Sequence, residues 1–199
     1  DKNPDSILTE LGVRDDDNTN SDFFSIEISP FNDGINAFEF MVSAAGVQVD
    51  VKYSAESDGD YNWDAVWYSE TKITDKGWNV EIKIPFSALR FPKKDKQSWG
   101  LNIWRTIRRY REESSWSYVD NSKDEDLPQA GLLKGIEDIE PPIRLSLTPY
   151  ISGYLEHYED YAYTFNGGMD LKYGINESFT LDMTLIPDFL KVESDDIIL

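Results

Sequence analysis

The sequence predicts an all-β protein, and three observations support this fold class. Aromatic residues make up 14% of the 199 residues, a share that favours strands over helical bundles. Apolar and polar residues alternate one by one through several stretches, which is the period of a strand with one buried face. Clusters of Gly, Asn and Asp separate these stretches, as expected of turns. We therefore expect an antiparallel β-sandwich, with more antiparallel strands after it.

A short helix over residues 3–12 is the one exception that the sequence predicts. Asn3 can cap its first turn, Pro4 is favoured in that turn, and Gly12 can end the helix. The apolar residues between them share one helical face.

An acidic loop follows the predicted helix. Between Asp15 and Asp22 the chain has four Asp and two Asn side chains. Calcium takes about six to eight oxygen ligands, so this loop could bind it. We name Asp15, Asp17 and Asp22 as the candidate calcium ligands, and the alternative is a loop that is simply solvated.

The sandwich strands are expected where the alternation is clearest. A strand over 77–86 should bury Trp78, Val80, Ile82 and Ile84 on one face, because these residues alternate with polar ones. The other strands are expected over 24–28, within 37–53, and over 65–73, 99–110 and 115–119.

The chain changes character at Pro141-Pro142, and we place a domain boundary between residues 140 and 141. Residues 145–155, 164–173 and 179–185 then predict long strands, with a turn at Gly174–Ser178. Strands of about ten residues with strict alternation are typical of outer-membrane β-barrels. A soluble antiparallel hairpin with one wet face has the same pattern, so both interpretations stay open.

Composition excludes several functions. The net charge of −19 disfavours nucleic acid as a partner. The chain has no Cys, which excludes disulfides and thiol catalysis, and its one His, His157, leaves little room for histidine-based catalysis. Glu112 and Glu113 could be imagined as the acid and base of a glycosidase, but chance pairs are expected in so acidic a chain. We expect no enzyme.

Aromatic and arginine residues are the candidates for ligand binding. Tryptophan and tyrosine rings stack on sugars, and arginine can hold a carboxylate or sulfate. The alternatives are packing in the core for the rings and pairing with acids for the arginines. The candidate ligand-binding residues are Trp63, Trp67, Trp104, Arg105, Arg108, Trp116 and Tyr118.

Several short strings together resemble envelope proteins of Gram-negative bacteria in which a carbohydrate-binding family 9-like (DOMON-like) sandwich precedes an outer-membrane β-barrel. The strings are Arg14-Asp15-Asp16, Ser21-Asp22-Phe23-Phe24, Trp63-Asp64-Ala65-Val66-Trp67, Gly77-Trp78-Asn79-Val80-Glu81, Ile84-Pro85-Phe86, Leu89-Arg90-Phe91, Trp99-Gly100-Leu101-Asn102, Arg105 with Arg108 and Arg109, Ile186-Pro187-Asp188-Phe189, and Val192-Glu193-Ser194-Asp195.

This resemblance implies a jelly-roll-like sandwich over residues 1–140 and the first barrel strands over 141–199. It also implies that the first sandwich strands precede Asp1 and that most of the barrel follows Leu199. The expected location is the cell outer membrane, with the sandwich in the periplasm or at the cell surface.

The resemblance further implies a non-catalytic module that recognises a glycan or another small-molecule ligand. An envelope protein is a possible partner. The alternative is a plug, lid or assembly-partner domain of the barrel that binds no small molecule, and a glycoside hydrolase is a third hypothesis.

Overall fold

A computed structural model describes residues 3–123, 125–157, 161–175 and 179–186, and these residues form an all-β structure. The chain divides into two compact units, Asp1–Pro142 and Ile143–Leu199. The last strings of the resemblance, from Pro187 onward, lie outside the described residues. No helix among the described residues is long and apolar enough to cross a membrane.

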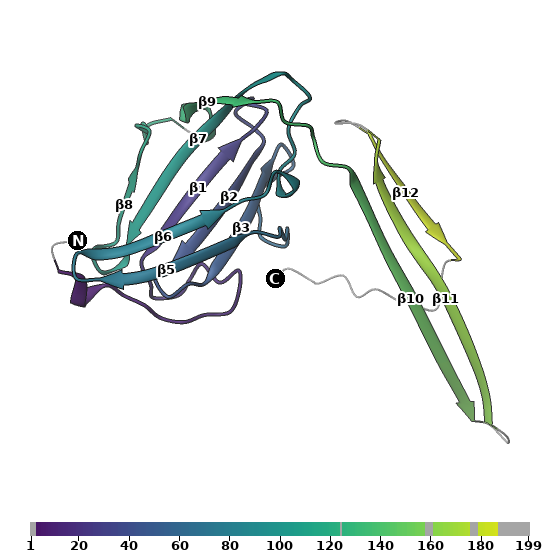
Figure 1. Cartoon of the computed structure of the whole chain (residues 1–199). Helices are drawn as coiled ribbons and strands as arrows, with labels where there is room; N and C mark the ends of the chain where they lie inside the picture. The colour runs from purple at the N-terminus through teal and green to yellow at the C-terminus, as the bar shows by residue number, and fades with distance from the viewer. Residues whose placement is uncertain (1–2, 124, 158–160, 176–178, 187–199) are drawn as a thin grey trace. The chain divides into compact units, whose positions relative to one another are not determined.

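A seven-stranded antiparallel sheet forms the centre of the first unit (Figure 1). Its order is β4-β3-β2-β1-β7-β8, and β9 pairs with the first half of the long strand β7. The strands are β1 (Phe23–Ser29), β2 (Ala37–Ser43), β3 (Gln48–Ser54), β4 (Ser57–Asp60), β7 (Lys96–Ile107), β8 (Glu112–Ser115) and β9 (Gly131–Glu137).

A hairpin of β5 (Tyr68–Thr74) and β6 (Gly77–Lys83) lies across one face of this sheet and makes the second layer of the sandwich (Figure 1). We call the covered side the hairpin face and the other side the far face. The expected strand over 77–86 is confirmed over 77–83. Val80, Ile82 and Ile84 pack on the core as predicted, but each remains half-buried.

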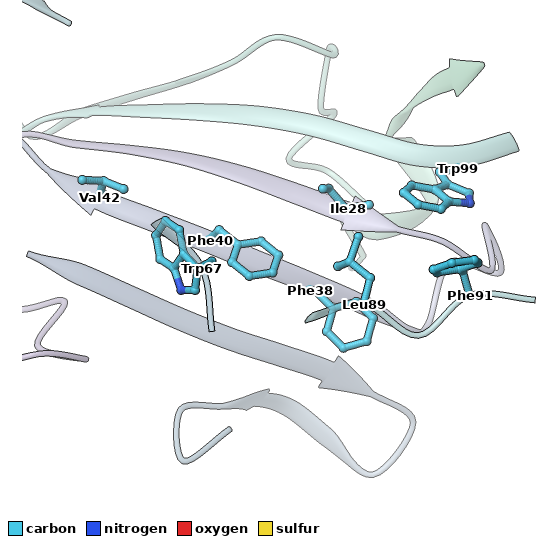
Figure 2. Close-up of a cluster of buried hydrophobic side chains, with 8 residues drawn as sticks. All are labelled: Ile28, Phe38, Phe40, Val42, Trp67, Leu89, Phe91 and Trp99. Atoms are coloured by element: carbon cyan, nitrogen blue, oxygen red, sulfur yellow. The ribbon is translucent and has the colours of Figure 1, made fainter. Parts of the chain in front are cut away.

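The core lies between the hairpin and the sheet, because Val80 and Ile82 of β6 pack against it. Figure 2 shows its buried side chains along the strands of the sheet. Phe40 of β2 is fully buried, and its ring centroid lies 5.2 Å from that of Trp67. Along β1 and β2 every second side chain points into this layer, and those side chains are apolar. The buried members are Ile28, Phe38, Phe40, Val42, Trp67, Leu89, Phe91 and Trp99.

The far face carries both apolar and charged residues. Val49 and Val51 of β3 are fully buried in a second, smaller cluster. Glu27 and Glu39 also lie on this face, because they alternate with core residues of β1 and β2, and they are only 7% and 8% exposed.

Four predicted elements are corrected by the structure. The strand expected over 99–110 ends at Ile107, and Arg108–Tyr110 form a 3-10 turn instead. The expected helix over 3–12 is wrong: only Pro4–Ser6 forms a 3-10 turn, and the backbone N–H of Asp22 donates to the Leu8 carbonyl instead. A ten-residue helix is marginal on its own, so long-range partners decide this segment. The expected strand over 65–73 begins only at Tyr68.

The strand expected over 115–119 instead ends at Ser115. The backbone N–H of Trp116 still donates to Ile103, but the next one, of Ser117, donates to the Asn102 side chain. A side-chain acceptor therefore replaces the strand partner at this point.

The second unit is a three-stranded sheet in which β10 (Arg144–His157), β11 (Tyr161–Gly174) and β12 (Thr180–Leu185) pair in sequence order. Strands are thus confirmed where the alternation predicted them. The predicted turn at Gly174–Ser178 lies partly outside the described residues.

The register of this sheet separates its side chains by polarity. Leu147 pairs with Leu171, which pairs with Met183, whereas the neighbouring row contains Thr148, Asp170 and Thr184. Ile151 and Phe165 of the apolar face are 82% and 71% exposed in this unit. One face is therefore apolar over most of the described strand length and is not covered by any described part of its own unit.

Candidate functional site

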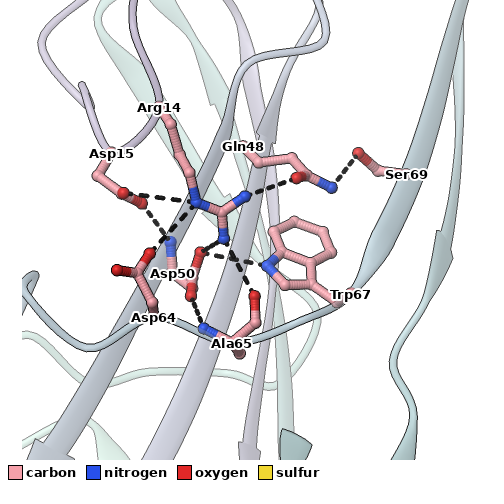
Figure 3. A network of polar contacts seen from close by, with 8 residues as sticks. All are labelled: Arg14, Asp15, Gln48, Asp50, Asp64, Ala65, Trp67 and Ser69. Carbon is pink, nitrogen blue, oxygen red and sulfur yellow. Dashed lines mark hydrogen bonds and ion pairs between the residues drawn. The ribbon is translucent and has the colours of Figure 1, made fainter. Parts of the chain in front are cut away.

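Three acids from separate parts of the first unit converge beside the hairpin (Figure 3). Asp15 comes from the loop before β1, Asp50 from β3, and Asp64 from the segment before β5, and ligand atoms of all three lie within 4.8 Å of one another. Such a group has the chemistry to hold a metal ion.

The guanidinium group of Arg14 already lies among these acids. Its Nη2 is paired with Asp50, and its Nε lies 3.5 Å from an oxygen of Asp15 and 3.4 Å from one of Asp64. Arg14 also donates to the Gln48 side chain at 2.8 Å. The positive charge that a metal would supply is therefore present on the chain itself.

Asp50 is the buried centre of this network. It is fully buried, and besides Arg14 it accepts from the backbone N–H of Ala65 at 2.6 Å and from Trp67 Nε1 at 3.2 Å. The backbone of Ala65 is thus bonded to a side chain, which explains why the strand expected from residue 65 begins later.

Burial raises the pKa of Asp15, and the neighbouring charge of Asp50 adds to this, while its bond to the Asp50 backbone N–H and the charge of Arg14 oppose it. The other predicted calcium ligands lie elsewhere. Asp17 accepts from Asn18, and Asp22 is fully buried and accepts from the backbone N–H of Arg108. Among the described residues, neither Asp17 nor Asp22 belongs to a group of three acids whose oxygens lie within 4.8 Å of one another.

The predicted ligand-binding residues do not form one site. Trp67 is 4% exposed and lies in the core, and Trp63 is half-buried with its ring 5.0 Å from that of Phe38. Arg108 reaches back to the carbonyl of Asn18 at 3.4 Å and so holds the first loop.

The remaining candidates lie on or beyond β7 and β8. Trp104 pairs with Ser25 and therefore lies on the far face. Trp116 is 61% exposed and covers Gly131, where an added Cβ would come 2.5 Å from the Trp116 ring. Tyr118 is 83% exposed.

One predicted residue, Arg105, does line a pocket. This pocket of about 590 Å³ lies at the turn end of the β5–β6 hairpin, and we call it the hairpin pocket. Arg105 pairs with Phe24 across β1 and β7, which places both on the hairpin face. Other lining residues are Lys76, Trp78, Asn79 and Glu81.

Trp78 was assigned to the core by its alternation with polar residues, but it is half-buried at this pocket. It is the second residue of β6, beside the turn, and it is not among the residues that pack on the core; Val80, which also lines the pocket, and Ile82 lie further along the strand and do pack there. The sequence signal that could have identified Trp78 as a pocket residue is its position next to the turn.

Carboxyl groups on the far face have perturbed acidities. Burial, with smaller contributions from the negative charges of Glu39 and Asp126, raises the pKa of Glu27 to about 7. Burial likewise raises the pKa of Glu113, which also faces Glu39 and Asp126. Tyr53 donates to Glu39 at 2.7 Å, and burial raises the pKa of this phenol.

Comparison with known proteins gives one match. A family model described as a domain of unknown function, DUF5916, matches residues 141–199. This range contains the second unit, and no activity accompanies the family's description. Neither the curated proteins nor the solved structures give a match.

We expect Arg14→Gln to lower the free energy of unfolding by about 2–3 kcal/mol, because it leaves the buried Asp50 carboxylate with fewer partners. Chemical denaturation measures this loss. Arg111→Gln is the control, since Arg111 is exposed, and it should change stability by less than about 0.5 kcal/mol. Equal stabilities of the two variants would contradict the role given to Arg14.

We expect Glu27 to make stability depend on pH. A carboxyl group whose pKa is raised on folding favours the native state below its unfolded value of 4.5, and this contribution is lost as the pH rises through about 7. The loss is about 3 kcal/mol. Denaturation measured between about pH 4.5 and 8 should show that Glu27→Gln lacks this pH-dependent loss of stability. The variant should be more stable than the wild type above neutral pH. Parallel pH profiles of the two proteins would refute the assignment.

Proposed function

We propose that the first unit is a non-catalytic binding module for a glycan or a glycan-like ligand, and that an outer-membrane protein carries it. The observation that supports ligand binding is the hairpin pocket, whose lining includes Trp78 and the basic residues Lys76 and Arg105. Its volume of about 590 Å³ is in the usual range for small-molecule sites.

The lining of this pocket matches the chemistry of a sugar. An indole ring offers an apolar surface to the C–H face of a pyranose. Arg105 lies on the hairpin face, and with Lys76 of the turn it can bond to a hydroxyl or an acidic substituent. A glycan, neutral or acidic, therefore fits this pocket better than a purely apolar ligand.

The resemblance to carbohydrate-binding family 9-like (DOMON-like) sandwiches supports the same proposal. Gly77-Trp78-Asn79-Val80-Glu81, one of the strings that carry it, supplies most of the pocket's β6 wall.

Trp78→Ala should weaken glycan binding by on the order of 1–3 kcal/mol, because it removes the stacking surface. A glycan array identifies the ligand, and calorimetry measures the affinity. Trp116→Ala is the matched control, since Trp116 is exposed and does not line the pocket. If Trp78→Ala lowers the melting temperature without changing affinity, the ring has a structural role, as expected of a plug or lid domain.

We also propose that β10–β12 are strands of an outer-membrane β-barrel. The supporting observation is their register, which gathers apolar side chains such as Leu147 and Met183 on one face. Strands of such barrels present one apolar face to lipid and one polar face to the interior. At 14 residues each, β10 and β11 exceed the nine to eleven or so that a tilted strand needs to cross a membrane.

Insertion into lipid should depend on which face receives a charge. Leu147→Lys places an ammonium on the apolar face and should cost about 2–4 kcal/mol of membrane binding, whereas Thr148→Lys lies on the polar face and should cost little. Flotation of the full chain with phosphatidylcholine vesicles measures both. Equal partitioning of the two variants would argue for a soluble second unit.

We propose calcium for the group formed by Asp15, Asp50 and Asp64, in place of the set of Asp15, Asp17 and Asp22 that the sequence predicts. Because Arg14 has to leave before an ion can enter, we expect calcium to raise the melting temperature of Arg14→Gln more than that of the wild type.

A further inference from the structure

A second pocket, on the far face, is lined by acids. Its volume is about 720 Å³, and we call it the acid pocket. Glu27 lies inside it, while Glu56, Glu125 and Asp126 line it from two loops. No Lys or Arg is among its described lining residues. Glu27 and Phe24 are three positions apart on β1, so the acid pocket and the hairpin pocket lie on opposite faces of the sheet.

Glu27 is the buried residue of this pocket whose carboxyl group lacks a partner among the described residues. It is 7% exposed, and its carboxyl group makes no hydrogen bond or ion pair with a described residue. Its neighbour Glu39, by contrast, accepts from Ser25 at 2.6 Å and from Tyr53 at 2.7 Å. The Glu27 oxygens are not among the fully buried unpaired atoms, so they open into the pocket, where a ligand that donates to them offsets the cost of their partial burial.

The pocket suits an organic cation better than a bare metal ion. Among the described residues, no three of its carboxyl groups come within 4.8 Å of one another, so no cage for a metal is formed. Ile35 and Leu127 add apolar surface to the lining. An aliphatic amine combines N–H donors for a carboxylate with methylene groups for such surface.

We propose that the acid pocket binds a small linear polyamine, with one ammonium group donating to Glu27 and another held by the carboxylates of Glu56, Glu125 and Asp126. This site does not depend on the glycan proposal, because the two pockets share no lining residue.

The charge state of Glu27 adds a signature to this site. Near neutral pH its carboxyl group is partly protonated, because burial raises its pKa to about 7. An ammonium group favours the ionised form, so binding should release a proton. The ionisable groups that face Glu27 are Glu39, Tyr53 and Asp126, and Glu113 faces two of these.

Calorimetric titration of the full chain with spermidine, at physiological salt and about pH 7, tests the proposal. We expect saturable binding at one site, with a heat that depends on the ionisation enthalpy of the buffer because a proton is released. Glu27→Gln should weaken the affinity about tenfold or more and abolish the buffer dependence. Glu70→Gln is the charge-matched control and should behave as the wild type, since Glu70 is exposed and lines neither pocket.

Three outcomes would overturn the proposal. The first is an absence of saturable binding to the wild type. The second is equal weakening by Glu27→Gln and Glu70→Gln, which would show that spermidine responds only to the net charge of −19. The third is displacement of spermidine by an equal concentration of magnesium, which would show a general cation effect. The melting temperature of Glu27→Gln verifies that the variant is folded.

Discussion

The buried carboxylate of Asp50 is the interaction on which the arrangement of the first unit depends. It lies on the hairpin face of the sheet, in a position that the alternation of β3 would otherwise give to a core residue. A charge buried there is tolerated only if donors surround it. Those donors come from distant parts of the chain: Arg14 from the first loop, and Ala65 and Trp67 from the segment that leads into the hairpin.

This requirement explains several features together. The first loop has to reach β3, so Arg14 and Asp15 are held close to the sheet, and the backbone N–H of Asp15 donates to the Gln48 carbonyl at 3.0 Å. The segment before β5 has to present its backbone to Asp50, so it stays irregular until Tyr68. Trp67 supplies a donor at its edge and packs its ring on Phe40. One buried charge thereby links the loop, the sheet and the hairpin.

The two faces of the central sheet differ in the side chains that they bury. The hairpin face is a mostly apolar core that opens, at the hairpin turn, into a pocket with an aromatic ring and basic groups. Carboxyl groups on the far face are partly buried, and this burial raises the pKa of Glu27 and of Glu113. The acids of the far face line a pocket without a described Lys or Arg, whereas those of the hairpin face lie near Arg14 or near Lys76 and Arg105.

The alternation of residues by itself determined the all-β class, the strands over 77–83 and the three strands of the second unit, because a period of two follows from the backbone of a strand alone. It also separated the apolar residues Leu171 and Met183 from the polar residues Asp170 and Thr184, which the structure pairs in two neighbouring rows. Only the tertiary structure decided the fate of residues 3–12, of the acidic loop and of the predicted ligand-binding residues. The helix expected over 3–12 was replaced by contacts with residues more than ten positions away. Asp15 joined Asp50 and Asp64 rather than Asp17 and Asp22. Trp67 lies in the core and Arg105 lines a pocket. The position of each side chain depends on which distant residues pack beside it, and the local alternation of residues does not carry that information.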